Sequence, residues 1–188
     1  MSENYPLPSR SIRGLAETLA SLKIDYALVG GVAVALMARP RFTADVDAVL
    51  LDVDDRLEWL IHKMSEAGYA ARAQDQLDFA RRNRVLTLRD SFEVNVDLML
   101  GLLPFDVELV ARGEKVLLEG TEIVVANPQF LLVMKAVAWR PKDLDDLVEL
   151  AAINPDIDRE FVLETFAEYA ELLDVPERVN DLKRLLGW

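Results

Sequence analysis

The alternation of apolar and polar positions changes period several times along the first half of the chain. Apolar residues at three- and four-residue spacing predict a helix through residues 13–23, and a short apolar run then predicts a buried strand over 24–31 that ends in a glycine turn. Residues 32–38 are small and apolar, which favours a short buried helix packed close to a sheet. A second apolar run predicts a strand over 45–52, after which Asp52 is expected to cap the next helix.

The middle of the chain carries further strand patterns. Residues 92–100 show the clearest alternation, which predicts a strand whose apolar face includes Phe92. Residues 84–90 alternate in part and predict another strand, and two apolar runs around Glu119-Gly120 predict a hairpin. By contrast, residues 69–83 are polar and weakly patterned, so we expect a strand edge and a loop there.

After Asn127-Pro128 the pattern becomes wholly helical. Stretches with helical spacing are separated by Pro141, Pro155 and Pro176. The predicted fold class is therefore α+β, with a small mixed sheet flanked by helices. We expect this sheet in a core domain over residues 1–126, followed by a small helical lobe over 127–188.

Composition narrows the functional classes. The chain has 188 residues, 52% of them hydrophobic, which is enough for one ordinary core with a small lobe. The absence of cysteine excludes disulfides and thiolate metal sites, and His62 as the single histidine argues against a histidine-based metal site. A formal net charge of −12 argues against a broad electrostatic grip on nucleic acid. The chain has no leader-like apolar segment and no apolar run of ~20 residues, so we expect a cytoplasmic protein without a membrane span.

Two carboxylates at the start of a predicted strand pose a physical problem. Asp45 and Asp47 are two residues apart, so both side chains point to the same face and repel each other. A hard divalent cation such as Mg²⁺ would join them through oxygen ligands. The alternative is that both carboxylates end a strand and face water. Asp97 adds a third acid on the alternating strand, where Glu93 and Asn95 share its face, so the identity of the third group stays open.

The glycines upstream suggest what such a site would hold. Gly30-Gly31 lies at a strand-to-helix junction, where glycine permits close backbone approach and the first amides of a helix can bind phosphate. A glycine pair alone is usually only a tight turn. Its position before the paired acids gives it more weight.

The order of strand, Gly-Gly, short helix, Asp-x-Asp strand and later acid resembles the nucleotidyltransferase superfamily, which has the polymerase-beta-like fold. The segment RFTADVDAVL is similar to the Arg-x-Thr-x-Asp-hydrophobic-Asp form of the minimal nucleotidyltransferases and of the abortive-infection type IV toxin–antitoxin nucleotidyltransferases. The segment VLLEGTEIVVANPQFLLVMKAVAWRPKDLDDLVEL resembles the linker hairpin and helices that follow in that group. The resemblance spans residues 26–150.

The resemblance implies a role for each matching position. Gly30 and Gly31 would hold an NTP, Asp45 and Asp47 would bind two Mg²⁺ ions, and Asp97 would complete the metal site and help to deprotonate an acceptor hydroxyl. Further contacts to the nucleotide would come from Arg41, Thr43, Lys135, Arg140 and Lys142. The alternative for the last three is ordinary solvated helix charge.

Two features qualify this assignment. Asp143 and Asp146 share one helical face, and they are expected either to pair with Arg140 or Lys142 or to contribute to the site. Val32 follows the glycine pair where many active members of the superfamily have a small hydroxyl residue. This departure removes one phosphate contact but leaves the backbone amides in place.

The functional prediction is an Mg²⁺-dependent nucleotidyltransferase that moves a nucleoside monophosphate from an NTP onto a hydroxyl. The acceptor would be an RNA, a protein or a small molecule such as an aminoglycoside, and the resemblance implies a toxin–antitoxin or phage-defence module. The alternative is a catalytically weak or inactive antitoxin or partner-binding protein with the same fold. In that case Trp139, Tyr169 and Trp188 would offer a partner surface, unless they pack in the core.

Overall fold

The computed structural model describes residues 8–39 and 43–188, so the predicted site residue Arg41 lies outside the described residues. The chain divides into two compact units. The first comprises residues 1–35 and 40–126, and the second comprises 36–39 and 127–188. Among the described helices, none has the length and apolar character needed to cross a membrane.

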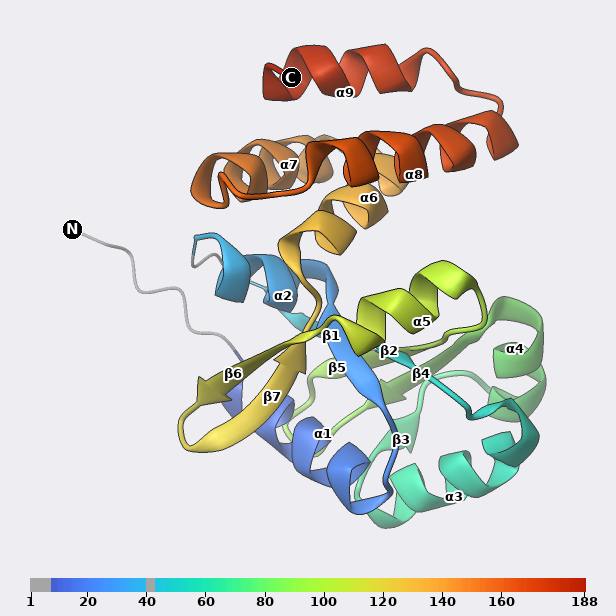
Figure 1. Ribbon diagram of the computed structural model, residues 1–188. Coiled ribbons are helices and arrows are strands. Elements are labelled where there is room, and N and C mark those ends of the chain that lie inside the picture. Colours follow the sequence, from blue (N-terminus) through green and yellow to red (C-terminus); the bar gives the residue numbers. More distant parts are fainter. Residues whose placement is uncertain (1–7, 40–42) are drawn as a thin grey trace. The chain divides into compact units, whose positions relative to one another are not determined.

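The described part of the first unit is built around a seven-stranded mixed sheet in the order β3-β4-β5-β2-β1-β7-β6 (Figure 1). Strand β2 runs antiparallel to β1 on one side and parallel to β5 on the other. The outer hairpin of β6 and β7 joins β1 through a parallel pairing with β7. The strands are β1 Tyr26–Val29, β2 Asp45–Leu50, β3 Ala70–Ala71, β4 Val85–Arg89, β5 Asn95–Leu100, β6 Glu114–Leu118 and β7 Thr121–Val125.

Helices surround this sheet, and α1 and α3 lie on the same side of it in the view of Figure 1. The helices are α1 Ser9–Ser21, α2 Gly30–Met37, α3 Leu57–Glu66, α4 Gln76–Asn83 and α5 Pro104–Ala111. The predicted apolar stripe of α1 is confirmed, because Ile12, Leu15 and Leu19 are fully buried. On the strands, Val46 and Val96 are also fully buried, so the alternate residues Asp45, Asp47 and Asp97 belong to the opposite face.

The prediction of a strand edge and loop over residues 69–83 was wrong in its second half. Only Ala70–Ala71 forms a strand, and residues 76–83 form helix α4. The helix is capped by Asp75, whose Oδ1 accepts a hydrogen bond of 3.2 Å from the backbone N–H of Asp78. Most of its residues are polar and half are exposed, so its apolar period is too weak to recognise in the sequence.

Two boundaries also differ from the prediction. Phe92 lies in the turn before β5 and is 55% exposed, because Glu93 adopts a positive φ of 63° that interrupts the extended backbone. Asp52 likewise has a positive φ of 54°, and a short 3₁₀ turn, Asp54–Arg56, comes between it and α3. Asp52 is therefore a turn residue and not the cap of that helix.

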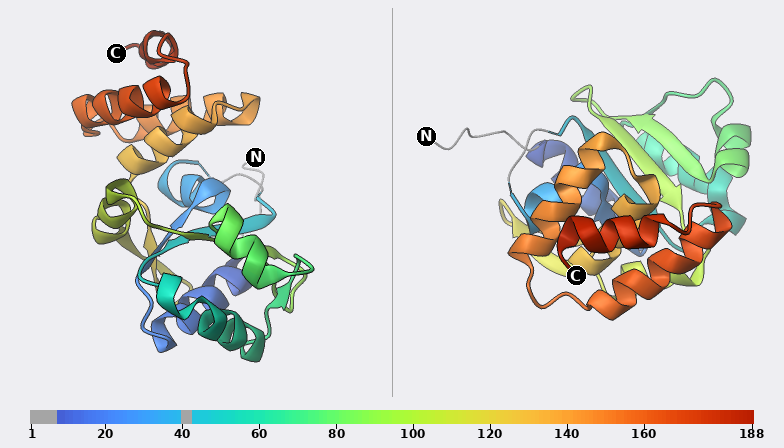
Figure 2. Two further views of the ribbon diagram at one scale, coloured as in Figure 1. Left: turned by 90° about the vertical axis from the view of Figure 1, so that its right-hand side faces the viewer. Right: turned by 90° about the horizontal axis from the view of Figure 1, so that it is seen from above.

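The second unit is helical, as the proline spacing predicted. Helices α6 Pro128–Ala138, α7 Pro141–Ile153, α8 Arg159–Leu172 and α9 Arg178–Leu186 pack in pairs, with α6 against α7 and α8, and α9 against the same two helices (Figures 1 and 2).

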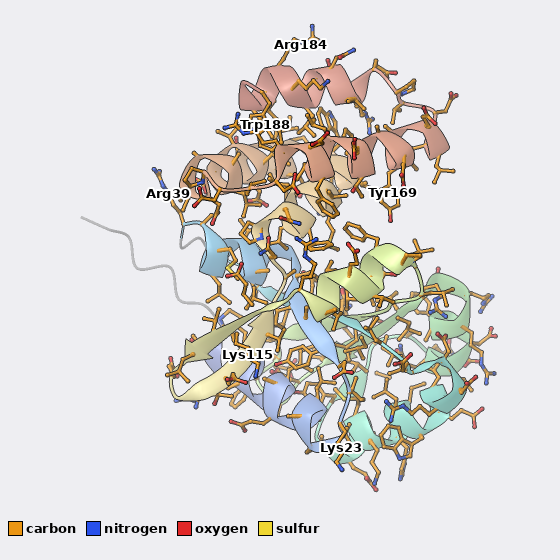
Figure 3. All side chains as sticks on the ribbon, in the orientation of Figure 1. Lys23, Arg39, Lys115, Tyr169, Arg184 and Trp188 are labelled. Atoms are coloured by element: carbon orange, nitrogen blue, oxygen red, sulfur yellow. The ribbon has the colours of Figure 1, made fainter. Side chains whose placement is uncertain are left out.

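The aromatic side chains of this unit largely find partners within it. Trp139 stacks on Phe166 with a centroid distance of 6.1 Å, and Trp188 lies 5.5 Å from the guanidinium of Arg159. Tyr169 on α8 is half-buried (Figure 3). The expected partner surface is therefore reduced, because the rings of Trp139 and Trp188 already have contacts inside the lobe.

Candidate active site

A lateral row of side chains crosses one face of the sheet in the first unit. Asp47 on β2 pairs with Asp97 on β5, and Asp97 pairs in turn with Thr87 on β4. Arg72, just after β3, donates its backbone N–H to the carbonyl oxygen of Thr87 at 2.9 Å, which extends the row to the sheet edge. Strand pairing therefore brings together two of the predicted acids and an arginine that was not predicted.

A second row lies two residues away on the same face. Asp45 pairs with Asn95, and Asn95 pairs with Arg89. The side chains are linked along this row, because Asn95 Nδ2 donates to Asp45 Oδ1 at 3.0 Å and Arg89 donates to Asn95 Oδ1 at 3.4 Å. Arg89 also pairs with Glu93 at 3.3 Å. The two rows have the same order, with acids toward the middle of the sheet and an arginine toward its β3 edge.

The glycine turn lies against the middle of the first row. Val29 at the end of β1 pairs with Asp47, and Gly30 follows with a positive φ of 66°. A Cβ atom at Gly30 would lie 2.8 Å from Asp47 Cγ and closer still to Oδ2. Only glycine therefore fits both this backbone conformation and this approach to the carboxylate. Gly30 and Gly31 open α2, where the first N–H groups of a helix have no partner within it.

The third acid on this face is Asp97. Its carboxylate accepts a hydrogen bond from the guanidinium of Arg72. Burial raises the pKa of Asp97, Arg72 lowers it and Asp45 raises it, and the net direction is upward. Burial and a neighbouring carboxylate thus disfavour the ionised form, and added positive charge at this place would favour it. Glu93 lies in the turn before β5, so it does not take this position.

The acids fit divalent cations in chemistry and register, but their side chains have protein partners as they stand. Paired residues on neighbouring strands lie about 5 Å apart, and carboxylate oxygens are the donors that Mg²⁺ takes. Within residues 8–39 and 43–188, however, no three His, Cys, Asp or Glu side chains form a group that would hold a metal ion. Asp97 is turned to Arg72 and Asp45 to Asn95. Strand pairing thus brings the carboxylates close to one another, but their oxygens do not converge on a single metal position.

Two further predicted positions lie beside the acids and the glycines. Thr43 precedes β2, and its hydroxyl donates to the Asp45 carbonyl oxygen at 3.4 Å, which holds the loop at the start of the strand. Val32 is fully buried on α2, so its side chain belongs to the core.

The predicted cations of the second unit lie in a separate cluster. Lys135 Nζ is 3.0 Å from Asp143 Oδ1 and 2.7 Å from Asp146 Oδ2, and these side chains are 6%, 0% and 4% exposed. Arg140 Nε lies 2.6 Å from Asp143 Oδ2. Burial alone raises the pKa of Asp143, but hydrogen bonds from Arg140 and Lys135 outweigh it and lower the pKa to about 2. Lys142, in contrast, is exposed.

This cluster changes the interpretation of Lys135. Its charge is neutralised inside the lobe, so the expected triphosphate contact is not part of the site proposed below. Asp143 and Asp146 were expected to pair with Arg140 or Lys142 or to join the site. They bind Lys135, and Asp143 binds Arg140 as well.

Sequence reasoning missed the two arginines of the rows. Arg72 was hidden because residues 69–83 carry almost no pattern and because its partner is 25 positions away. Arg89 was detectable in principle, since it lies within the partly alternating segment 84–90.

Solved structures with a similar fold include a nucleotidyltransferase-like protein and an adenylyltransferase. An antigenic nucleotidyltransferase-like protein from Paracoccidioides brasiliensis is 19% identical, with 95% of this chain and 93% of that chain covered and a TM-score of 0.57. The lincosamide antibiotic adenylyltransferase LnuA is 15% identical, with 80% and 99% covered and a TM-score of 0.55. The antibiotic-resistance factor ANT(2'')-Ia is 11% identical, with 92% and 96% covered and a TM-score of 0.62. At these identities the likeness concerns the fold.

The fold class is therefore that of the nucleotidyltransferases, as the order of glycines and acids predicted. Residues 11–186 match the family described as "Nucleotidyltransferase of unknown function (DUF6036)", and the chain belongs to this family. No curated protein matches the chain significantly in sequence.

Proposed function

We propose that the protein is an Mg²⁺-dependent nucleotidyltransferase that moves a nucleoside monophosphate from an NTP onto a hydroxyl. One observation carries the proposal: Asp47 lies opposite Asp97 and directly against Gly30, in a chain of a nucleotidyltransferase family. A glycine turn that can bind phosphate thus adjoins carboxylates that can bind cations.

Each group has a role in this reaction. Asp45, Asp47 and Asp97 would hold Mg²⁺, which when bound would neutralise the phosphate charge that develops in the reaction. The N–H groups of Gly30 and Gly31 would donate to phosphate oxygens. The acceptor oxygen forms a bond to the α-phosphorus while the bond to pyrophosphate breaks, and Asp97 takes the hydroxyl proton.

The acceptor is an RNA end, a protein hydroxyl or a small molecule. Proteins of this fold support the last class, since one is a lincosamide adenylyltransferase and another has been seen with adenylyl-2"-tobramycin. A cytoplasmic toxin–antitoxin or phage-defence module stays a prediction that rests on the sequence resemblance.

A second candidate is a binding protein of the same fold without turnover. The hydrogen bond between Arg72 and Asp97 favours it, because an arginine can take the place of a cation on an acid that no longer binds one. The two candidates differ in whether Asp97 exchanges Arg72 for a metal ion.

Label transfer distinguishes the candidates. The protein is incubated with Mg²⁺ and each α-labelled NTP, in the presence of total RNA, a protein extract or tobramycin. We expect Asp45→Asn/Asp47→Asn to lower transfer at least about a thousandfold. The matched control is Asp55→Asn, an exposed acid of the same unit.

Each outcome decides something. Transfer that survives the double substitution would show that the site is elsewhere. NTP binding without transfer to any acceptor would support the binding protein, and the absence of both would overturn the two candidates together.

A further inference from the structure

The candidate site has two chemically different ends along the sheet. In the order β3-β4-β5-β2-β1, Gly30 follows β1 and Arg72 follows β3, with the acids on the strands between them. Four strand spacings of about 4.8 Å separate the outer strands, so the ends are about 19 Å apart along the backbone. The Arg72 guanidinium reaches back across β4 to Asp97.

Both arginines are accessible, and neither is locked in a buried pair. The Arg72 side chain is 28% exposed and its partner Asp97 is 32% exposed. The Arg89 side chain is 47% exposed and pairs with Glu93, which is 80% exposed, so that pair contributes little. Arg72 is positioned by its backbone bond to Thr87 and needs no side-chain partner to stay at this edge.

In-line displacement gives the two ends different substrates. The attacking and leaving oxygens lie on opposite sides of the phosphorus. With the pyrophosphate of the NTP held at the glycine turn, the acceptor hydroxyl must enter from the opposite side. That side of the acids is the one with Arg72 and Arg89.

We propose, on the basis of the function proposed above, that Arg72 and Arg89 bind the acceptor and that the acceptor carries a phosphate group next to its hydroxyl. Guanidinium groups bind phosphate oxygens through paired, charge-assisted hydrogen bonds. Arg72 becomes available for this contact when Asp97 takes a metal ion. An acceptor rich in ammonium groups, such as an aminoglycoside, meets like charge here, which disfavours it.

The phosphate has two sources, a polynucleotide end or a small phosphorylated molecule. One arm of the test therefore compares an RNA hexamer with the same hexamer carrying an uncharged methylphosphonate at its last linkage. The other arm compares AMP with adenosine. Binding is measured with Mg²⁺ and a non-hydrolysable NTP analogue, and transfer is then measured with labelled NTP.

In one of the two comparisons, the more charged molecule (the unmodified RNA hexamer or AMP) should bind at least tenfold more tightly than its uncharged counterpart and be the better acceptor. Arg72→Gln and Arg89→Gln should each raise the KM for that acceptor about tenfold and leave the KM for NTP within twofold. Arg72→Lys should restore part of the binding. The matched control, Arg81→Gln, removes an exposed arginine of α4 that pairs with Glu58, and should change neither KM.

Failure of the acceptor inference and failure of the proposed function give different results. If transfer occurs equally well to the uncharged members, or better to tobramycin, the acceptor inference is overturned and the nucleotidyltransferase function stands. If Arg81→Gln matches the other two variants, the effect is one of general charge and the placement on the two rows is wrong. If the protein neither binds nor transfers NTP, the proposed function fails and the inference fails with it.

Discussion

Each unit of the molecule contains a cluster of charged side chains. The two clusters differ in burial, and we call a cluster closed when its charges are buried and paired with one another. In the second unit, Lys135 lies between Asp143 and Asp146, and all three are almost completely buried. In the first unit, Asp97 and Arg72 form a pair that is about 30% exposed. A buried set of charges is stable only when every charge is paired, whereas a partly exposed pair can exchange its partner for a ligand.

This difference teaches how to separate structural from functional charge. Lys135 and Asp97 both belong to regions that resemble nucleotidyltransferase motifs, and the sequence assigned both to the site. Exposure separates them, because a ligand can reach Asp97 without unfolding anything, and reaching Lys135 requires breaking two buried contacts.

The largest expected effect is on the closed cluster. Lys135→Met removes the ammonium group that binds both buried carboxylates and leaves Asp143 with Arg140, and we expect a loss of about 3–5 kcal/mol in the free energy of unfolding. Denaturant unfolding measures it, with exposed Lys142→Met as a control that should stay within about 0.5 kcal/mol. Adding Asp143→Asn and Asp146→Asn to Lys135→Met should recover much of the loss. If Lys135→Met leaves the denaturant midpoint unchanged, the buried carboxylates do not depend on Lys135 for stability.

A smaller effect is expected from pH. The pKa of Asp143 is lowered to about 2 from an ordinary value near 3.9, so its contribution is present above pH ~4 and is lost as the pH falls toward 2. This amounts to about 2–3 kcal/mol, which Asp143→Asn should remove from the acid limb of a stability profile. Exposed Asp145→Asn is the control. For Asp97, whose pKa is raised, the sign is opposite: its contribution is lost as the pH rises. Identical acid limbs for Asp143→Asn and the wild type would contradict the pairing.

The smallest effect concerns the glycine turn beside the open cluster. Gly30→Ala places a methyl group against the Asp47 carboxylate, and Gly120→Ala has a similar positive φ with no atom within 4 Å of the added Cβ. Both variants carry the strain of the backbone, so their difference isolates the clash. We expect Gly30→Ala to be less stable than Gly120→Ala by about 1–2 kcal/mol and to weaken NTP binding selectively. Equal losses of stability in both variants would show that the Asp47 side chain moves away from the added methyl group with no loss of free energy.

Much of the fold followed from local pattern. The stripe on α1, the strand with Asp45 and Asp47, and the helices between prolines were all predicted, because apolar spacing and proline geometry are properties of short segments. Helix α4 was missed because its apolar positions are few. The Phe92 boundary was missed because a positive φ at Glu93 leaves no pattern in neighbouring residues.

Some features of the candidate site also follow from local sequence, and others depend on tertiary structure. The sequence by itself determined that two acids share a face of one strand and that a glycine pair precedes them, because side-chain alternation and backbone freedom are local. Only the tertiary structure decided that Arg72 meets Asp97, because β3, β4 and β5 must first pair to bring them together. It also decided that Lys135 is buried, because the packing of α6 against α7 surrounds its ammonium group with two carboxylates.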